Sequence, residues 1–233
     1  MREPHLAAGA AIAVGAALLF VALACAVLHE GAASALDRDV LAWLRDHAGP
    51  SLLRSMQLVS AWHAPRAIVV MTALVALVLA WRRDWADAVT VLVVVFGGAT
   101  LNHLLKHGLQ RARPVFGEVA AGPTDFSFPS GHVANATLLY GVVAALLIWR
   151  FRARRIRFGV ALGAVLLVAS VGFSRLVLGA HHPSDVLAAL LVGVAWLALC
   201  MVVREWLGAA GAPQKIRVAL WRLGAAIGWM GRR

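Results

Sequence analysis

An arginine, a histidine and an aspartate lie close together in residues 174–185, which read SRLVLGAHHPSD. The planar guanidinium of Arg175 can hold phosphate oxygens through paired, charge-assisted hydrogen bonds. A neutral His181 can attack phosphorus, and Asp185 can fix the imidazole tautomer and stabilise the charged ring that follows. Pro183 suits the first position of a helix, which would bring the side chains of His181 and Asp185 together. The stretch indicates phosphate chemistry, although by itself it also fits a pair of interfacial anchors.

A second cluster, residues 106–114, reads KHGLQRARP and follows an apolar run. Lys106 and Arg113, on an irregular loop, can grip one phosphate from two sides, and Pro114 stiffens the exit from that loop. The alternative interpretation of this cluster is a basic belt at a membrane edge.

A third cluster, residues 126–132, reads FSFPSGH and precedes another apolar run. Ser130 is a natural N-cap, and Gly131 lets a phosphate approach the backbone. A helix N-terminus presents unpaired N–H groups and partial positive charge to an anion. His132 would then lie beside the phosphate, where a proton donor to the leaving oxygen is needed. An interfacial histidine is the alternative.

The sequence gives little evidence for a metal site or a disulfide bond. His103 and His107 are one helical turn apart, but no third ligand is evident nearby, so neither a metal site nor a cofactor is predicted. Cys25 and Cys200 fall in apolar runs near opposite membrane faces in the topology below. They are expected to be small buried apolar residues that form no disulfide.

The composition is that of an integral membrane protein. Hydrophobic residues make up 61% of the 233 residues, and the mean hydropathy is +0.80. Soluble domains are only about 45–50% apolar. The net charge of +11 favours loops that face anionic lipid over a nucleic-acid partner, and none is predicted.

The predicted fold is all-α and polytopic, one membrane-embedded domain over residues 1–233. Its motif core is 86–203, and 214–233 is a basic tail of interfacial character. The first apolar run is too long for a typical signal-peptide core and is taken as a transmembrane helix. About 20 apolar residues cross a bilayer, which predicts six spans near residues 7–28, 66–81, 86–105, 133–149, 157–174 and 184–203.

Between the first two spans, residues 30–64 predict an amphipathic helix on the membrane surface, then a break at Gly49-Pro50 and a weaker helical pattern over 51–62. This segment is assigned packing or a lid, and no chemistry. Its expected apolar face is Leu36, Val40, Leu41 and Leu44, and its expected polar face is Asp37, Arg38, Arg45 and Asp46.

The basic residues predict the orientation. With both termini in the cytoplasm, 14 of the 22 Lys and Arg residues fall inside, as the positive-inside rule requires. Four of the remaining eight lie beside the predicted site, namely Lys106, Arg111, Arg113 and Arg175. All three clusters fall on the two outer loops that join spans three to four and five to six. The topology therefore brings them to one face, where positive charge would attract an anion.

At these residues the chain resembles the type-2 phosphatidic acid phosphatase family, the lipid phosphate phosphatases that share a helical core with vanadium haloperoxidases. The family pattern is K-x6-RP, then PSGH, then SR-x5-H-x3-D, and this chain matches all three in type, spacing and order. The resemblance spans about 86–203, and six helices are typical of the bacterial membrane members. His182 stands where many relatives carry an aromatic residue. A side chain that supports the site is one interpretation, and a lipid-facing side chain is the favoured one.

The resemblance implies a role for each matched residue. His181 would attack phosphorus and form a phosphohistidine, with Asp185 holding its orientation. His132 would protonate the departing oxygen and later help to activate water. No metal would be needed, because cationic side chains neutralise the phosphate. The implied phosphate-binding residues are Lys106, Arg113, Ser130, Gly131 and Arg175.

The function expected from this resemblance is a phosphatase of the bacterial inner membrane that removes phosphate from a lipid phosphate or diphosphate at the outer face. Undecaprenyl diphosphate, phosphatidylglycerophosphate and phosphatidic acid all fit as substrates. The expected partners are this substrate and the membrane lipids, and no protein partner is indicated. The alternatives are a phosphotransferase that uses the same histidine, a vanadate-dependent haloperoxidase, and a non-catalytic lipid-binding relative.

Overall fold

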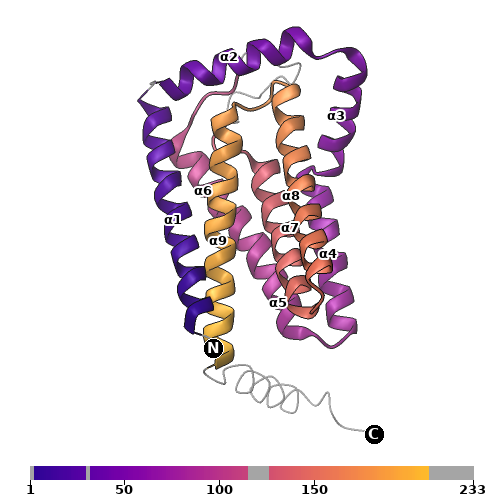
Figure 1. The fold of residues 1–233 in the computed structure, drawn as a ribbon. Coiled ribbons are helices and arrows are strands. Elements are labelled where there is room, and N and C mark those ends of the chain that lie inside the picture. The colour runs from indigo at the N-terminus through magenta and orange to yellow at the C-terminus, as the bar shows by residue number, and fades with distance from the viewer. Residues whose placement is uncertain (1–2, 30–31, 115–125, 210–233) are drawn as a thin grey trace, which may run out of the picture.

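The computed structural model describes residues 3–29, 32–114 and 126–209, and every regular element in these ranges is helical (Figure 1). The basic tail predicted over 214–233 lies outside them. The all-α prediction is confirmed. The elements are α1 Glu3–Leu28, α2 Ala32–His47, α3 Pro50–Trp62, α4 Pro65–Trp81, α5 Trp85–Leu92, η1 Val93–Gly97, α6 Gly98–Leu109, α7 Gly131–Arg150, α8 Arg154–Val177 and α9 Pro183–Ala209.

The long helices form a bundle, and α2 lies across one end of it (Figure 1). α7 packs against α6, α8 and α9, while α1 runs alongside α9. The start of α1 and the end of α9 lie together at the end of the bundle opposite to α2. The chain therefore presents one end covered by α2 and one end where α1 begins and α9 finishes.

Five helical segments of the described chain are each long and apolar enough to cross a membrane: α1, α5 to α6, α7, α8 and α9. A sixth candidate span consists of α3 and α4 together, which are bent by 50° at the break between them. Five of the six predicted spans are present as single candidates. The second differs in one respect, because the candidate span there combines the 17-residue α4 with α3 across a bend. The weak helical pattern over 51–62 is thus half of a bent segment.

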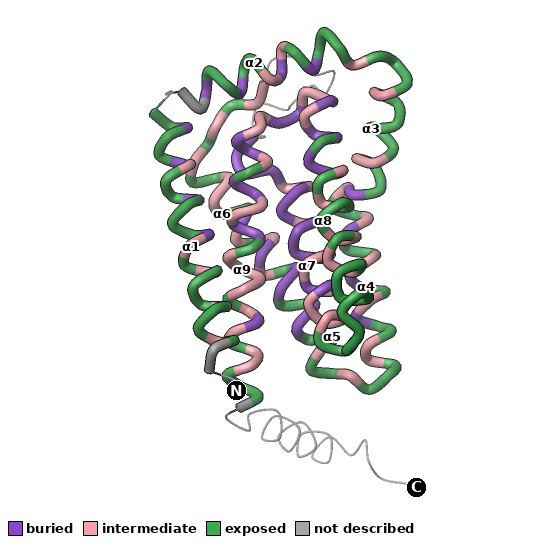
Figure 2. The backbone as a smooth tube through the Cα atoms, viewed as in Figure 1, coloured by how far each residue is buried: buried purple, intermediate pink, exposed green. Residues whose placement is uncertain are grey.

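Buried residues lie mainly inside the bundle and exposed residues on its outer helices (Figure 2). Core side chains line α7 and the third span, where Val91, Val94 and Val95 pack with Leu138 and Val142. Large apolar side chains on α1, α4 and α8 instead point outward, including Leu18, Leu74, Leu77, Val165 and Leu166. An apolar exterior of this kind requires lipid around it. Cys25 and Cys200 are free thiols, as predicted, but neither is buried as expected: Cys25 is exposed on α1 and Cys200 is half-buried on α9.

The third span contains a π-helical turn, η1, between α5 and α6. The carbonyl oxygen of Val94 in this turn accepts a hydrogen bond of 3.1 Å from the indole Nε1 of Trp196 on α9. A Cβ on Gly97 would lie only 2.6 Å from the Trp196 ring, so glycine is needed for this close approach. Trp196 thereby fixes α9 against the third span, whose last helix, α6, ends within the 106–114 cluster.

The orientation of α2 differs from the predicted amphipathic face. Leu41 and Leu44 are buried as expected, but Leu36 is 62% exposed, whereas Asp37 is only 2% exposed. Asp37 was expected on the polar side. Burial of a carboxylate is costly unless charged or hydrogen-bonding partners compensate for it, and Arg111 and Ser184 at this end of the bundle are such partners.

Candidate active site

The three predicted clusters meet at the bundle end that α2 covers. Residues 106–114 begin in the last turn of α6, so Lys106 is helical and not on a loop as expected; residues 126–132 lead into α7, and residues 174–185 form the turn between α8 and α9. The backbone N–H of Ser130 donates to the carbonyl oxygen of Asp185 at 3.2 Å, which ties the 126–132 cluster directly to the 174–185 cluster. The side chain of Arg113 joins the 106–114 cluster to the 174–185 cluster through the carbonyl oxygen of Ala180 at 2.9 Å.

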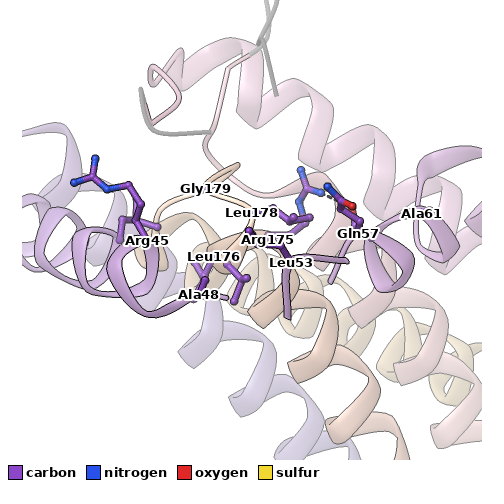
Figure 3. Close-up of a pocket in the computed structure, with 12 residues that line it drawn as sticks. Arg45, Ala48, Leu53, Gln57, Ala61, Arg175, Leu176, Leu178 and Gly179 are labelled. Carbon is purple, nitrogen blue, oxygen red and sulfur yellow. Dashed lines mark hydrogen bonds between the residues drawn. The ribbon is translucent and has the colours of Figure 1, made fainter. Parts of the chain in front are cut away.

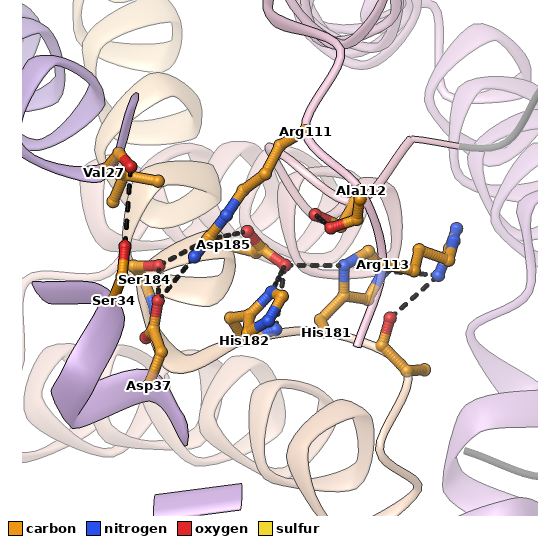
Figure 4. A network of polar contacts seen from close by, with 12 residues as sticks. Val27, Ser34, Asp37, Arg111, Ala112, Arg113, His181, His182, Ser184 and Asp185 are labelled. Carbon is orange, nitrogen blue, oxygen red and sulfur yellow. Dashed lines mark hydrogen bonds and ion pairs between the residues drawn. The ribbon is translucent and has the colours of Figure 1, made fainter. Parts of the chain in front are cut away.

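The two ring nitrogens of His181 face opposite charges (Figure 4). Nδ1 lies 3.5 Å from Oδ2 of Asp185, and Nε2 lies 3.4 Å from Nη1 of Arg113. A carboxylate beside Nδ1 favours the tautomer that carries its proton there. The lone pair of Nε2 then points toward the guanidinium, where a phosphate oxygen would also be drawn.

His181 is held neutral by its surroundings. Its side chain is almost completely buried, and this burial is the main reason why its pKa falls from 6.5 to about 4. Asp185 opposes the shift, while the positive charges of Arg113 and Arg175 add to it. The neutral imidazole therefore predominates at ordinary pH, and only the neutral ring has a lone pair for attack.

Asp185 lies in the first turn of α9, which begins at Pro183 as predicted. Its Oδ1 accepts a 2.6 Å ion-pair hydrogen bond from Nη1 of Arg111, and its Oδ2 accepts a 2.8 Å bond from the backbone N–H of His182. The ring Nδ1 of His182 is also 3.3 Å from Oδ2, and its side chain is only 15% exposed. Of the two interpretations of His182, this contact favours the side chain that supports the site, and the lipid-facing one is wrong.

The PSGH segment places a hydroxyl and a helix N-terminus in the site. Ser130 occupies the N-cap position of α7, but its side chain makes no capping hydrogen bond. Its Oγ is buried and finds no hydrogen-bond partner among the described residues, which leaves it available to a ligand. The space beside Gly131 is open, since an added Cβ would meet only Asn102, at 3.9 Å.

Positive side chains surround the next residue, His132. It lies close enough to Arg175, Arg113 and Lys106 to interact with their charges, and also with His181. Arg175 is buried in the last turn of α8. The structure thus gathers every site residue singled out in the sequence at one end of the bundle, in an arrangement suited to a phosphate.

Three residues near the site were missed as contributors. Arg111 was noted only as a nearby basic residue, yet it contacts Asp185. Asp37 of α2 pairs with Arg111 at 2.8 Å, and Ser60 of α3 accepts a hydrogen bond from Arg175. Arg111 could have been predicted to lie near the site, because it comes only two residues before Arg113 in the sequence. Asp37 and Ser60 lie far away in the chain and carried no such signal.

A cleft of about 410 Å³ adjoins Arg175, between α2, α3 and the end of α8 (Figure 3). Ser60 and Gln57 line it together with the apolar side chains of Leu41, Leu53, Leu176 and Leu178. The cleft therefore combines polar and apolar lining next to Arg175. Among the described residues, no three His, Cys, Asp or Glu side chains are grouped so that they could hold a metal ion.

Comparison with known proteins places this geometry in a family. The model of the PAP2 superfamily matches residues 87–209. Phosphatidylglycerophosphatase B of Bacillus subtilis is 34% identical over 116 residues, covering 49% of this chain and 56% of that protein. Lipid A 1-phosphatase of Rhizobium johnstonii is 34% identical over 129 residues, covering 52% and 48%. This chain thus spans about half the length of the curated relatives that it matches.

The crystal structure of a transmembrane PAP2-type phosphatidylglycerolphosphate phosphatase from Bacillus subtilis is also similar, with a TM-score of 0.76 and 27% sequence identity. The superposition covers 84% of this chain and 96% of that one. The similarity includes the membrane-spanning bundle, and the family model matches more than half of the 233 residues. This chain belongs to the PAP2 superfamily, among its membrane-bound bacterial members.

Proposed function

We propose that this protein is a lipid phosphate phosphatase that works through a phosphohistidine at His181. The observation that carries the proposal is the placing of His181 between Asp185 on Nδ1 and Arg113 on Nε2. Such a ring has a defined proton, a defined lone pair and a cation beside that lone pair. All three favour nucleophilic attack on a phosphate.

In the first step, the Nε2 lone pair of His181 attacks phosphorus, and the bond from phosphorus to the lipid oxygen breaks. His132 gives that departing oxygen a proton. Asp185 keeps the proton on Nδ1 and stabilises the positive charge that develops on the ring.

In the second step, water attacks the phosphohistidine. His132, now neutral, takes a proton from this water, the bond between phosphorus and nitrogen breaks, and inorganic phosphate leaves.

Positive charge for both steps comes from the protein. Lys106, Arg113 and Arg175 would bind the phosphoryl oxygens, with the hydroxyl of Ser130 and the backbone amide of Gly131 at the start of α7. Fixed cations and amides of this kind stabilise charge that develops in the transition state. Their number supports a reaction that proceeds without a metal ion.

The substrate we propose is a phosphomonoester or diphosphate of a membrane lipid. Phosphatidylglycerophosphate, undecaprenyl diphosphate and phosphatidic acid remain the candidates. Relatives named for phosphatidylglycerophosphate, lipid A and decaprenylphosphoryl-5-phosphoribose support this substrate class. The cleft beside Arg175 has the mixed lining that suits the lipid portion next to a phosphate. The acyl or prenyl chain would reach the site sideways from the leaflet.

The test is phosphate release by the detergent-purified protein from these three lipids, with and without EDTA. We expect release from at least one lipid, unchanged by EDTA and abolished in His181→Ala. His103→Ala, which changes an exposed histidine on α6, is the matched control and should keep full activity. A folded protein that releases no phosphate from any of them contradicts the proposal. Loss of activity in EDTA, restored by a metal, contradicts its metal-free form.

A further inference from the structure

We propose that Asp37 of α2 is a positioning residue of the active site, which acts through Arg111 on Asp185 and His181. This inference rests on the proposed function, because it concerns how the same histidine is prepared for attack. Asp37 belongs to the segment between the first two spans, outside all three sequence motifs and outside the matched range 87–209.

The contacts form one continuous chain (Figure 4). Arg111 reaches between two carboxylates: Nη2 lies 2.8 Å from Oδ2 of Asp37, and Nη1 lies 2.6 Å from Oδ1 of Asp185. The other oxygen of Asp185 faces the Nδ1 of His181. A displacement of Arg111 would therefore also displace the carboxylate of Asp185, which fixes the tautomer of His181.

Asp37 also holds the helix that carries Asp185. Its Oδ1 accepts a 2.9 Å hydrogen bond from the backbone N–H of Ser184, and its Oδ2 accepts one from the Ser184 hydroxyl. Ser184 lies in the first turn of α9, where N–H groups have no intrahelical partner. The Asp37 carboxylate supplies that partner from a different helix and favours the helix dipole as well. It thus fixes both Arg111 and the residue next to Asp185.

The charges of this network have a chemical consequence. Asp37, Asp185 and Ser184 are buried, and the Arg111 side chain is 13% exposed. Two carboxylates and one guanidinium leave one net negative charge beside His181. The imidazole becomes positive when its Nε2 bonds to phosphorus, so this negative charge stabilises the phosphohistidine. Without the charge of Asp37, Arg111 would neutralise Asp185 and this stabilisation would be lost.

The test compares Asp37→Asn with Asp39→Asn in the full-length protein. Asparagine keeps the shape of Asp37 and can still accept from Ser184, but it removes the charge. Asp39 is an exposed acidic residue on the same helix and serves as the control. We expect kcat of Asp37→Asn to fall about 10- to 100-fold with KM unchanged, as is usual when support of a catalytic group is removed. The proton NMR signal of His181 Nδ1–H should shift in this variant, and neither measure should change in Asp39→Asn.

Arg111→Lys is the second variant, because lysine keeps the charge but cannot bridge two carboxylates with a planar fork. It should reproduce both effects if Asp37→Asn fails to fold. A wild-type kcat and an unshifted His181 signal in a folded Asp37→Asn protein would overturn the proposal. So would a loss of activity that only follows the folded fraction while the signal stays in place. If the wild type hydrolyses no lipid, the proposed function fails, and the His181 signal alone then decides the role of Asp37.

Discussion

His181 is the residue on which the proposed chemistry depends, and its surroundings make its two nitrogens different. Asp185 lies beside one nitrogen and Arg113 beside the other. A histidine exposed at a membrane surface would have water on both sides and would be protonated in part near neutral pH. Burial among these partners keeps the imidazole neutral and gives its lone pair a fixed direction, which suits the proposed role as nucleophile.

The first prediction at this scale concerns pH. Because burial lowers the pKa of His181 to about 4, the ring should stay neutral as the pH falls through 6.5 and become protonated only near 4. Imidazole resonances of histidine-labelled protein, assigned with His181→Gln, would give the midpoint. A midpoint at 6.5 or higher would contradict the buried, neutral state.

His132 carries the second prediction. Since it is proposed to protonate the departing oxygen, His132→Ala should lower kcat by about 10²- to 10⁴-fold, the usual contribution of a general acid. The cationic side chains that hold phosphate would remain, so inhibition by inorganic vanadate should persist. Steady-state kinetics with vanadate measure both quantities, with His103→Ala as the control. Normal turnover in His132→Ala would remove it from the mechanism.

At the scale of the elements, the contact of α9 with the third span helps to position the site residues that these two elements carry. Trp196 reaches the π-helical turn η1 and packs over Gly97. The same two elements carry residues of the proposed site at their ends, Asp185 on α9 and Lys106 on α6. A change in this contact should therefore mainly lower the stability of the folded protein, and should displace the site residues to a smaller extent.

Gly97→Ala tests this contact. The new Cβ would lie 2.6 Å from a rigid indole, so Trp196 must move and its bond to Val94 must weaken. Overpacking of this kind costs about 1–3 kcal/mol, which should appear as a lower thermal midpoint of the purified protein. Gly163→Ala on α8 is the control, because nothing lies within 4 Å of its Cβ position. Equal midpoints for both variants would mean that the indole accommodates the methyl group without cost.

At the scale of the whole molecule, the bundle has two chemically different ends. The site and the cap formed by α2 occupy one end, and the arginine-rich turn between α7 and α8 occupies the other. Arg150 pairs there with Asp84 at 2.7 Å, and Arg204 pairs with Asp87. Basic residues favour the cytoplasmic side, so we propose that the site faces outward.

Cysteine labelling in intact cells tests this orientation. In a background that lacks Cys25 and Cys200, Gly49→Cys lies at the exposed α2–α3 turn and Arg152→Cys at the exposed α7–α8 turn. A membrane-impermeant maleimide that can reach the outer face of the inner membrane should label the first in whole cells and the second only after lysis. The reverse pattern would place the site in the cytoplasm.

The sequence by itself determined the fold class, the helical spans and the residues that meet at the site. Apolar runs near membrane length and a proline or glycine at helix boundaries are local signals, so the helix of α9 from Pro183 and the break at Gly49 were predictable. The three motifs converge because the topology alone places their loops at one end of the bundle. No tertiary detail was needed for that conclusion.

Only the tertiary structure decided which partners surround these residues. Asp37 faces inward although the helical pattern put it on the polar side, because Arg111 and Ser184, 74 and 147 residues away, compensate its burial. His182 turns toward Asp185 for a similar reason. Periodicity records the average polarity of a helix face, whereas an ion pair depends on the positions of atoms from distant segments. The motifs can be recognised in the sequence, but the charged groups that lie around His181 depend on how the helices pack.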